Sequence, residues 1–163
     1  MPGDVSPSEW RAAMGYFPSG VTIVTTWDEG EPVGSTINAF CSVSLDPPLL
    51  LICLAHENPI RFALERAGVF GVNILHAEGR PIAHRFAREP LTDRFCEHAY
   101  RAAEGGAPQL EATPVFIDCA LEHLYPAGDH VIAVGRGVRI AHTPGAAPLL
   151  YHRGQFPSFG APS

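Results

Sequence analysis

Lysine is absent from this chain of 163 residues, so all eleven basic residues are arginine. Composition bias explains the missing lysine and gives it no functional meaning. The net charge is −6 and no stretch is rich in basic residues, so nucleic acid is not an expected partner. No apolar stretch approaches bilayer length, and the first residues lack the pattern of a secretory signal. These absences predict a soluble, cytoplasmic protein that binds neither nucleic acid nor membrane.

The common signatures of nucleotide, metal and hydrolase sites are also missing. The sequence has no G-x-x-x-x-G-K-[ST] loop, no G-x-G-x-x-G after a strand and no G-x-S-x-G. Its eight histidines never form H-x-x-x-H or a cysteine–histidine cluster at zinc spacing, so no metal site is expected. The four cysteines form no C-x-x-C pair, which suits a reduced protein with free thiols.

Hydrophobic residues make up 46% of the chain and charged residues 17%, which predicts one compact domain over residues 1–163. A helix is expected to begin at Ser6, where Ser6 and Glu9 can form a capping box, and to continue to Phe17. Further helices are expected from Asn58 and over 80–88. The expected strands cover 21–27, 32–35, 49–54, 69–75, 115–124, 130–141 and 149–151.

Hairpin turns at 28–31 and 128–129 and short spacings between strands favour an antiparallel barrel over alternating strand–helix units. The run 49–54 is apolar throughout, so it is expected to be buried on both faces. The tail from about residue 157 is rich in proline, glycine and serine and is predicted to be mobile.

The most informative stretch covers residues 34–48, and small and hydroxylic residues stand in strand-like sequence over its part 34–44. Room beside the backbone and short hydrogen-bonding groups come from Gly34, Ser35, Thr36, Asn38, Ala39 and Ser42. Such a stretch suits a planar, polar-edged ligand with a phosphorylated tail. The alternative is a polar strand edge with a turn rich in serine and threonine.

Two further places carry candidate chemistry. The turn Gly128-Asp129-His130 offers a histidine for proton transfer or for polarising an amide, although it can equally be a locally bonded turn residue. Arg85-Phe86 and residues 151–154 offer arginines for phosphate and aromatic rings to cover a ligand ring. A solvated helix face and a cluster at a strand end are the alternatives there.

Taken together, these segments resemble the flavin reductase family, the short-chain NAD(P)H:flavin oxidoreductases that serve two-component monooxygenases. The matching segments keep the family's order over nearly the whole chain and cover 17–26, 32–34, 38–40, 42–49, 70–75, 85–87, 128–130 and 149–154. The resemblance implies a mainly β, split β-barrel of the Greek-key, FMN-binding type with a few flanking helices. It also implies a homodimer that holds flavin near the subunit interface.

The resemblance assigns roles to individual residues. Those along the isoalloxazine ring and ribityl chain are Val33, Gly34, Ser35, Thr36, Asn38, Ala39 and Ser42. Those near the ribityl chain and phosphate are Cys53, Leu54, Ala55, Asn58, Pro59 and Ile60, with Arg85 and Phe86 also holding the flavin. Those bordering the nicotinamide are His130, Tyr151, His152, Arg153 and Gly154. Many relatives carry serine or threonine at the place of 58–60, so Arg61 and His56 are expected to compensate at the phosphate.

The implied reaction is hydride transfer from NADH or NADPH to free FMN or FAD. Backbone amides beside Thr36 and Asn38 would stabilise negative charge on the reduced ring, and His130 would position or polarise the nicotinamide. Reduced flavin would then leave for a separate monooxygenase, so weak flavin binding is expected. Two alternatives stay open: a flavin- or small-ligand-binding module without turnover, and a flavoprotein that acts on its own organic substrate.

Overall fold

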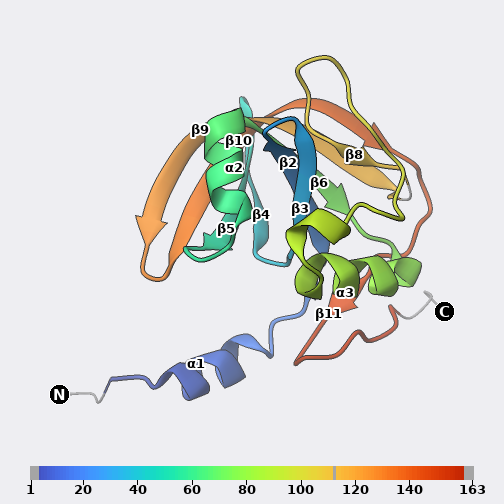
Figure 1. Ribbon diagram of the computed structural model, residues 1–163. Coiled ribbons are helices and arrows are strands. Elements are labelled where there is room, and N and C mark those ends of the chain that lie inside the picture. Colours follow the sequence, from blue (N-terminus) through green and yellow to red (C-terminus); the bar gives the residue numbers. More distant parts are fainter. Residues whose placement is uncertain (1–3, 112, 160–163) are drawn as a thin grey trace.

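The computed structural model describes residues 4–111 and 113–159, and this part of the chain is mainly β with three α-helices (Figure 1). The helices are α1 (Pro7–Met14), α2 (Ile60–Ala67) and α3 (Arg80–Arg88), with the 3-10 turns η1 (Ala77–Gly79) and η2 (Leu91–Asp93). The strands are β1 (Ser19–Gly20), β2 (Thr22–Asp28), β3 (Glu31–Ile37), β4 (Phe40–Leu45), β5 (Pro48–Ala55), β6 (Val69–Ile74), β7 (Tyr100–Arg101), β8 (Gln109–Leu110), β9 (Val115–Ala127), β10 (His130–His142) and β11 (Leu150–Tyr151).

Seven strands form one antiparallel sheet in the order β3-β2-β6-β9-β10-β5-β4. Two small pairs, β1–β11 and β7–β8, stand beside it. The edge strands β3 and β4 do not pair with each other in the described residues, so the sheet is not closed into a barrel. The turn between them still meets β5, because the Cys53 amide donates to the Ala39 carbonyl at 3.0 Å. Of the expected antiparallel barrel, the antiparallel pairing is confirmed and the closure is not.

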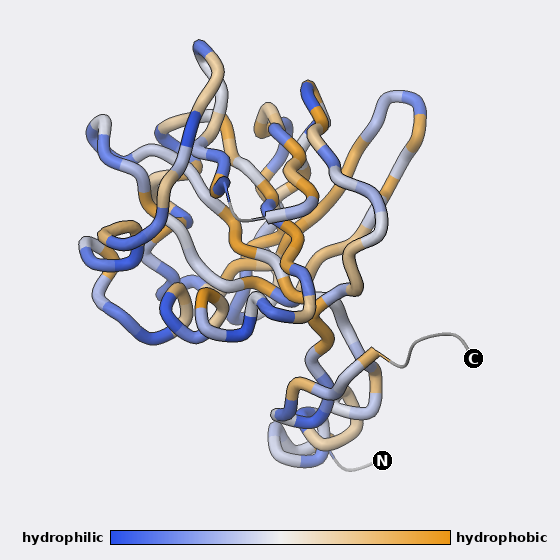
Figure 2. Tube along the Cα trace, turned by 90° about the vertical axis from the view of Figure 1, so that its right-hand side faces the viewer, coloured by the Kyte–Doolittle hydropathy of each residue, from blue (hydrophilic) through white to orange (hydrophobic). Residues whose placement is uncertain are grey.

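The core has two parts, and β2 and β3 contribute to the wall between them. One part lies under α2 and includes Val24, Ile52, Leu54, Leu64 and Phe70. The other lies under α3 and the C-terminal segment and is built from Val21, Ile23, Leu75, Ala83, Phe86, Leu110 and Leu149. Figure 2 shows apolar segments gathered in the central strands, with hydrophilic residues along the outer loops.

Strand β5 departs from its prediction. Leu50, Ile52 and Leu54 are buried, but Leu49 and Leu51 on the alternate face are only partly covered. The prediction that the run 49–54 is buried on both faces is therefore wrong. No second layer of the described chain covers the outer face of β5 and its neighbours, so the apolar side chains on that face stay partly exposed.

The N-terminal helix forms as predicted but ends earlier. The capping box is present, since the Glu9 amide donates to Ser6 Oγ and the Ser6 amide donates to Glu9 Oε2. The helix ends at Met14, before Phe17, and it buries none of its residues. Figure 1 shows α1 standing apart from the sheet.

Strand β4 was not among the expected strands, because its residues Phe-Cys-Ser-Val-Ser-Leu mix polar and apolar types at an open edge. Residues 160–163 of the predicted mobile tail lie outside the described residues. None of the helices in the described ranges is long and apolar enough to cross a membrane.

Candidate active site

A pocket of about 290 Å³ opens between the end of β3, helix α3 and the segment that follows β11. This volume lies at the lower end of the range of small-molecule sites, about 300–1,000 Å³. The lining residues are Val21, Thr36, Asn38, Ala83, His84, Ala87, Arg88, Tyr151, Gly154 and Phe156. Four of them, Thr36, Asn38, Tyr151 and Gly154, were predicted as site residues, and the fold brings them together from distant parts of the chain.

Strand β3 divides its residues between two faces because side chains alternate along a strand. Val33 and Ile37 join the core under α2, and the Ser35 hydroxyl accepts from Asn58 at the start of α2. Gly34 and Thr36 face α3 instead: the Thr36 hydroxyl donates to the Ala83 carbonyl at 2.6 Å. The predicted ring-binding stretch therefore presents only every second residue to the pocket.

Gly34 stands where β3 and α3 approach each other closely. A Cβ atom at this position would lie 2.9 Å from Phe86 Cε1 and 3.0 Å from the Val24 carbonyl oxygen. Phe86 itself is fully buried and packs edge-on against Phe95. Phe86, predicted to hold the flavin, thus lies buried between α3 and β3 and supports the pocket wall from the core.

Aromatic and cationic side chains form the wall opposite β3. Phe156 packs edge-on against both Tyr151 and His84, with ring centroids 5.5 and 5.3 Å apart, and the Arg80 guanidinium lies over its ring. At the neighbouring turn, the guanidinium of Arg153 lies 4.6 Å from the centre of the Tyr16 ring. A flat ligand ring entering this pocket would meet aromatic surface from several directions.

The turn after β11 shapes the pocket mouth. Arg153 and Gly154 have positive φ angles of 52° and 77°, and the His152 amide donates to the Gln155 carbonyl at 2.9 Å. Because this tight turn reverses the chain, Phe156 returns toward Tyr151. At the other side of the mouth, Asn38 Nδ2 donates to Ser19 Oγ at 3.4 Å.

A second group of predicted residues gathers at the start of α2. The Asn58 side chain donates to Ser35 Oγ at 3.3 Å and accepts from the Ile60 amide at 3.2 Å. Ile60 and Leu54 are fully buried, so their side chains serve the core. Cys53 is partly buried, which raises the pKa of its thiol and keeps it protonated.

Arg61, in the first turn of α2, has a polar atom that the fold leaves unpaired. Its Nε is buried and has no hydrogen-bond partner among the described residues. Its guanidinium lies 4.6 Å from the centre of the Phe62 ring. A cation at a helix start is a setting that suits a phosphate.

His130 belongs to the α2 group rather than to the pocket. It pairs with Ala55 on β5, and its Nδ1 lies 2.6 Å from Asp129 Oδ1. This hydrogen bond to His130 lowers the pKa of the Asp129 carboxyl. The nearby His56 ring bonds the Gly128 carbonyl, and its amide donates to the Asp129 carbonyl. Tyr151 and Gly154, given the same predicted role as His130, line the pocket.

Most of the remaining predicted residues lie outside both groups. Arg85 forms an ion pair with Glu97 and lines a second hollow of about 460 Å³, which shares His84 and Arg88 with the pocket. Ser42 is exposed on the edge strand β4, where it pairs with Leu50. Ala39 contributes its carbonyl to Cys53. Pro59 directly precedes α2 and so belongs to the group at the start of that helix.

Sequence reasoning missed six of the ten residues that line the pocket. Val21, Ala83, His84, Ala87, Arg88 and Phe156 carry no motif of their own. The one available signal was the helical spacing that puts Ala83, His84 and Ala87 on adjacent positions of one α3 face. Among the described residues no three histidine, cysteine or acidic side chains gather as a metal site would require.

Comparison with known proteins places the chain in a family. Residues 14–160 match the family model described as "Flavin reductase like domain". The chain is 38% identical over 153 residues to the reductase subunit HsaB of a flavin-dependent monooxygenase from Rhodococcus jostii, covering 93% of this chain and 77% of that protein. It is 38% identical to an NADH-dependent flavin reductase from a Rhodococcus species, covering 95% and 88%.

Solved structures agree with the sequence matches. The NADH:FAD oxidoreductase SgcE6 of Streptomyces globisporus superposes with a TM-score of 0.89 at 34% identity, covering 99% of this chain and 100% of that one. The same protein has also been solved in complex with NAD and FAD fragments. The resemblance seen in the sequence is thereby confirmed, and this chain belongs to the flavin reductase like domain family.

Proposed function

We propose that this protein uses NADH to reduce free FMN or FAD and that the flavin ring occupies the pocket between β3 and α3. The observation that carries this proposal is the convergence of Thr36, Asn38, Tyr151 and Gly154 on one ligand-sized pocket. The names of two relatives at 38% identity support it as well. One is named an NADH-dependent flavin reductase and the other the reductase subunit of a flavin-dependent monooxygenase. The flavin supplies the redox chemistry, so the protein's task is to hold two rings face to face.

Backbone amides at the open edge of β3 would stabilise the negative charge that develops on the flavin ring. Among the described strands β3 pairs only with β2, so half of its backbone amides point away from the sheet. Amides near Thr36 and Asn38 would donate to the carbonyl edge of the ring, where hydride transfer creates negative charge. Preorganised donors of this kind are worth roughly 3–4 kcal/mol each in other enzymes.

The phosphate end of the flavin is assigned to the start of α2. Asn58 and Ser35 are joined by a hydrogen bond on the far face of β3, and Arg61 offers an unpaired Nε. A flavin that wraps over the β3 edge would place its ring in the pocket and its phosphate near these groups. Val33, Ala39, Cys53, Ala55, Pro59 and Ile60 then border the ribityl chain.

The nicotinamide is assigned to the outer side of the ring. Tyr151 and Phe156 would cover it, while residues 152–154 form the turn beside it. His130 is assigned a positioning or polarising role, supported by the Asp129 carboxylate that holds its Nδ1. Because His130 lies in the α2 group, this role suits a nicotinamide nucleotide that extends from the pocket toward α2.

A homodimer accounts for apolar surface that one chain leaves uncovered. Val43 and Leu45 on β4 are 50% and 93% exposed, and Val138 and Ile140 on β10 are 55% and 63% exposed. Trp10 and Met14 of α1 are exposed as well. Two copies would bury these surfaces together, and the added layer would complete the split barrel. Light scattering in solution should give twice the mass of the chain.

The partner is a monooxygenase that consumes reduced flavin, because relatives are named as reductase subunits or components of flavin-dependent monooxygenases. A cytoplasmic location fits this task. The rival functions are a flavin-binding module without turnover and a flavoprotein that acts on its own organic substrate. Either rival would hold flavin tightly, whereas a reductase that supplies a partner must release it.

The deciding experiment follows absorbance at 340 nm with purified protein, NADH or NADPH, and added FMN, FAD or riboflavin in air. NADH oxidation that depends on added flavin is the expected result, and the flavins' relative rates identify the preferred one. Folded protein that oxidises neither nucleotide with any flavin would favour the binding module. Tightly bound flavin in the purified protein, without turnover of added flavin, would favour the self-contained flavoprotein.

A further inference from the structure

Arg94 is a cation buried against the strand that lines the pocket. Only 9% of the residue is exposed. Its Nη1 donates to the Gly34 carbonyl on β3 at 2.7 Å, and its Nε donates to the Glu89 carbonyl at the end of α3 at 2.8 Å. Burial lowers the pKa of the guanidinium, but an arginine stays charged at neutral pH.

This buried charge has no carboxylate partner within 4.0 Å in the described chain. Other arginines pair with acids: Arg66 with Asp28, Arg85 with Glu97, Arg136 with Glu122 and Arg139 with Asp118. Arg94 bonds two neutral carbonyls instead. A buried cation without a counterion is costly and creates a positive potential around it.

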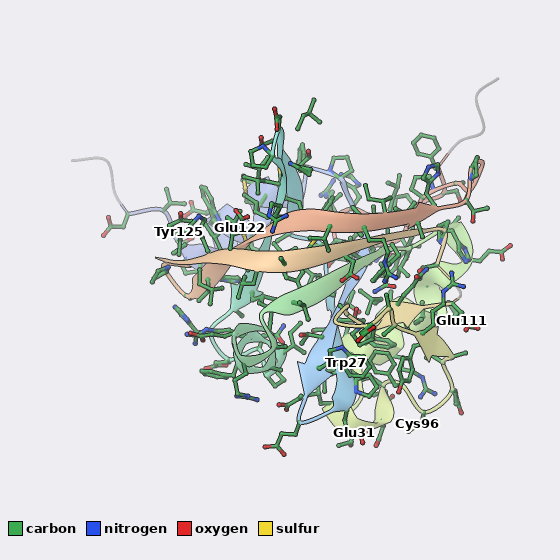
Figure 3. The ribbon with its side chains drawn as sticks, turned by 90° about the horizontal axis from the view of Figure 1, so that it is seen from above. Trp27, Glu31, Cys96, Glu111, Glu122 and Tyr125 are labelled. Atoms are coloured by element: carbon green, nitrogen blue, oxygen red, sulfur yellow. The ribbon has the colours of Figure 1, made fainter. Side chains whose placement is uncertain are left out.

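The positive potential falls on the ligand side of β3. Gly34 is the residue that Arg94 contacts, and Thr36, two residues further on the same face, lines the pocket. Two residues of strand span about 7 Å, so the guanidinium stands roughly 10 Å from the pocket. Figure 3 shows Cys96, close after Arg94, on the same side of the molecule as Trp27 and Glu31 of the β2–β3 hairpin.

We propose that Arg94 is a positioning residue for the reaction and that its charge makes the pocket favour the reduced flavin over the oxidised one. This inference rests on the proposed function. Hydride transfer from NADH brings two electrons and one hydrogen nucleus, so a neutral ring becomes an anion and NADH becomes NAD⁺. Arg94 acts on that anion through space, without touching the ring.

A structural role alone is the competing explanation, since Arg94 also joins the end of α3 to β3. The two explanations differ in redox dependence. A structural anchor affects oxidised and reduced flavin alike. A charge that acts on the ring affects the reduced form more, by about three- to tenfold at this distance in a partly solvated site.

The test measures the dissociation constants of oxidised and anaerobically reduced FMN, and of riboflavin in both states, for wild type and variants. Arg94→Gln keeps an N–H donor but loses the charge, and it should raise the ratio of the reduced to the oxidised constant three- to tenfold. Arg94→Lys keeps the charge and should leave the ratio close to that of wild type. Because each ratio compares two states of one protein, partial destabilisation cancels.

Arg66→Gln is the matched control, since it removes a positive charge from an exposed pair at the far end of α2. It should leave the ratio unchanged. An unchanged ratio in Arg94→Gln overturns the inference. So does an equal loss of affinity for oxidised and reduced FMN with no effect on riboflavin, because the charge of Arg94 would then act on the phosphate. If wild type binds no flavin at all, the proposed function fails and not this inference alone.

Discussion

The two faces of β3 carry the predicted flavin site in different ways. On the α2 face, polar groups are bonded to one another: Asn58 joins Ser35 and the Ile60 amide. On the α3 face, aromatic side chains surround a pocket that the described chain leaves empty of side chains. The α2 face stiffens the strand and offers a cation, whereas the α3 face offers space.

This difference shows how an edge strand can serve one extended ligand. A flat ring needs room and apolar cover, and a phosphate needs donors at a helix start. One strand with alternating side chains can supply both, because its two faces meet different helices. Variants that affect one face only can therefore test whether ring and phosphate are separated as proposed.

The largest effect is expected from filling the close approach on the α3 face. Gly34→Ala places a Cβ 2.9 Å from the Phe86 ring and 3.0 Å from the Val24 carbonyl. We expect a loss of about 1–3 kcal/mol in unfolding free energy and at least tenfold weaker flavin binding, because α3 must shift. Urea unfolding and fluorescence titration with FMN measure these two quantities.

Gly137→Ala is the control for this glycine exchange. The atom nearest to a Cβ at Gly137 is 3.8 Å away, an ordinary contact, so stability and flavin binding should stay near wild type. Equal behaviour of the two variants would mean that the packing of Phe86 against β3 does not shape the pocket.

The sharpest comparison of the two faces uses two asparagines. Asn38→Leu removes a polar group from the pocket and should weaken FMN and riboflavin alike, by about tenfold, the value of one to two lost hydrogen bonds. Asn58→Leu acts at the start of α2 and should weaken FMN while leaving riboflavin nearly unchanged. Isothermal titration with FMN and riboflavin measures both effects. If Asn58→Leu weakened both ligands and Asn38→Leu weakened FMN alone, the ring and the phosphate would have to exchange faces in our assignment.

Much of the scaffold could be predicted because its signals are local. The capping box at Ser6, the β-branched run of β2 and the turn at Gly128 each depend on neighbouring residues. The run 49–54 could not be placed correctly, since its outer face depends on what covers the sheet. Nothing within a strand's own sequence distinguishes a face buried by the same chain from one left open.

The site was harder to predict than the scaffold. Thr36 and Asn38 stood out because they belong to a run of small and hydrogen-bonding residues in strand-like sequence, where an apolar core would favour Val, Ile and Leu. Phe156 and Arg94 gave no such signal, because their importance comes from contacts with residues far away in the sequence. Phe86 and His130 were assigned from residue type and family order, and only coordinates reveal that the former is buried and the latter lies near α2.

A smaller effect is expected for His130→Ala on the α2 side. We expect kcat/KM for NADH to fall about three- to tenfold while flavin affinity stays within twofold, because His130 is assigned to the nicotinamide. Steady-state kinetics at low and saturating NADH, with flavin binding measured separately, test this assignment. His123→Ala, an exposed histidine on β9, is the matched control. Unchanged turnover at both NADH concentrations would remove His130 from the reaction.

The smallest effect concerns His98, which packs against Phe86 behind the pocket. Burial, and secondarily the charge of Arg85, lower the pKa of His98 below 6.5. The unfolded chain therefore binds this proton at higher pH than the folded chain does. The stability contributed by neutral His98 is complete above pH 6.5 and is lost as pH falls through the lower folded pKa.

His98→Phe keeps a ring against Phe86 but cannot titrate, so its unfolding free energy should depend less on pH below 6.5 than that of wild type. One proton sets an upper limit of about 1.4 kcal/mol per pH unit, and partial exposure makes the real slope smaller. Urea unfolding at several pH values between 7 and 5 measures it, with His142→Phe at the exposed end of β10 as control. If the pH dependence of the unfolding free energy is the same in His98→Phe as in wild type, a group other than His98 causes the loss of stability in acid.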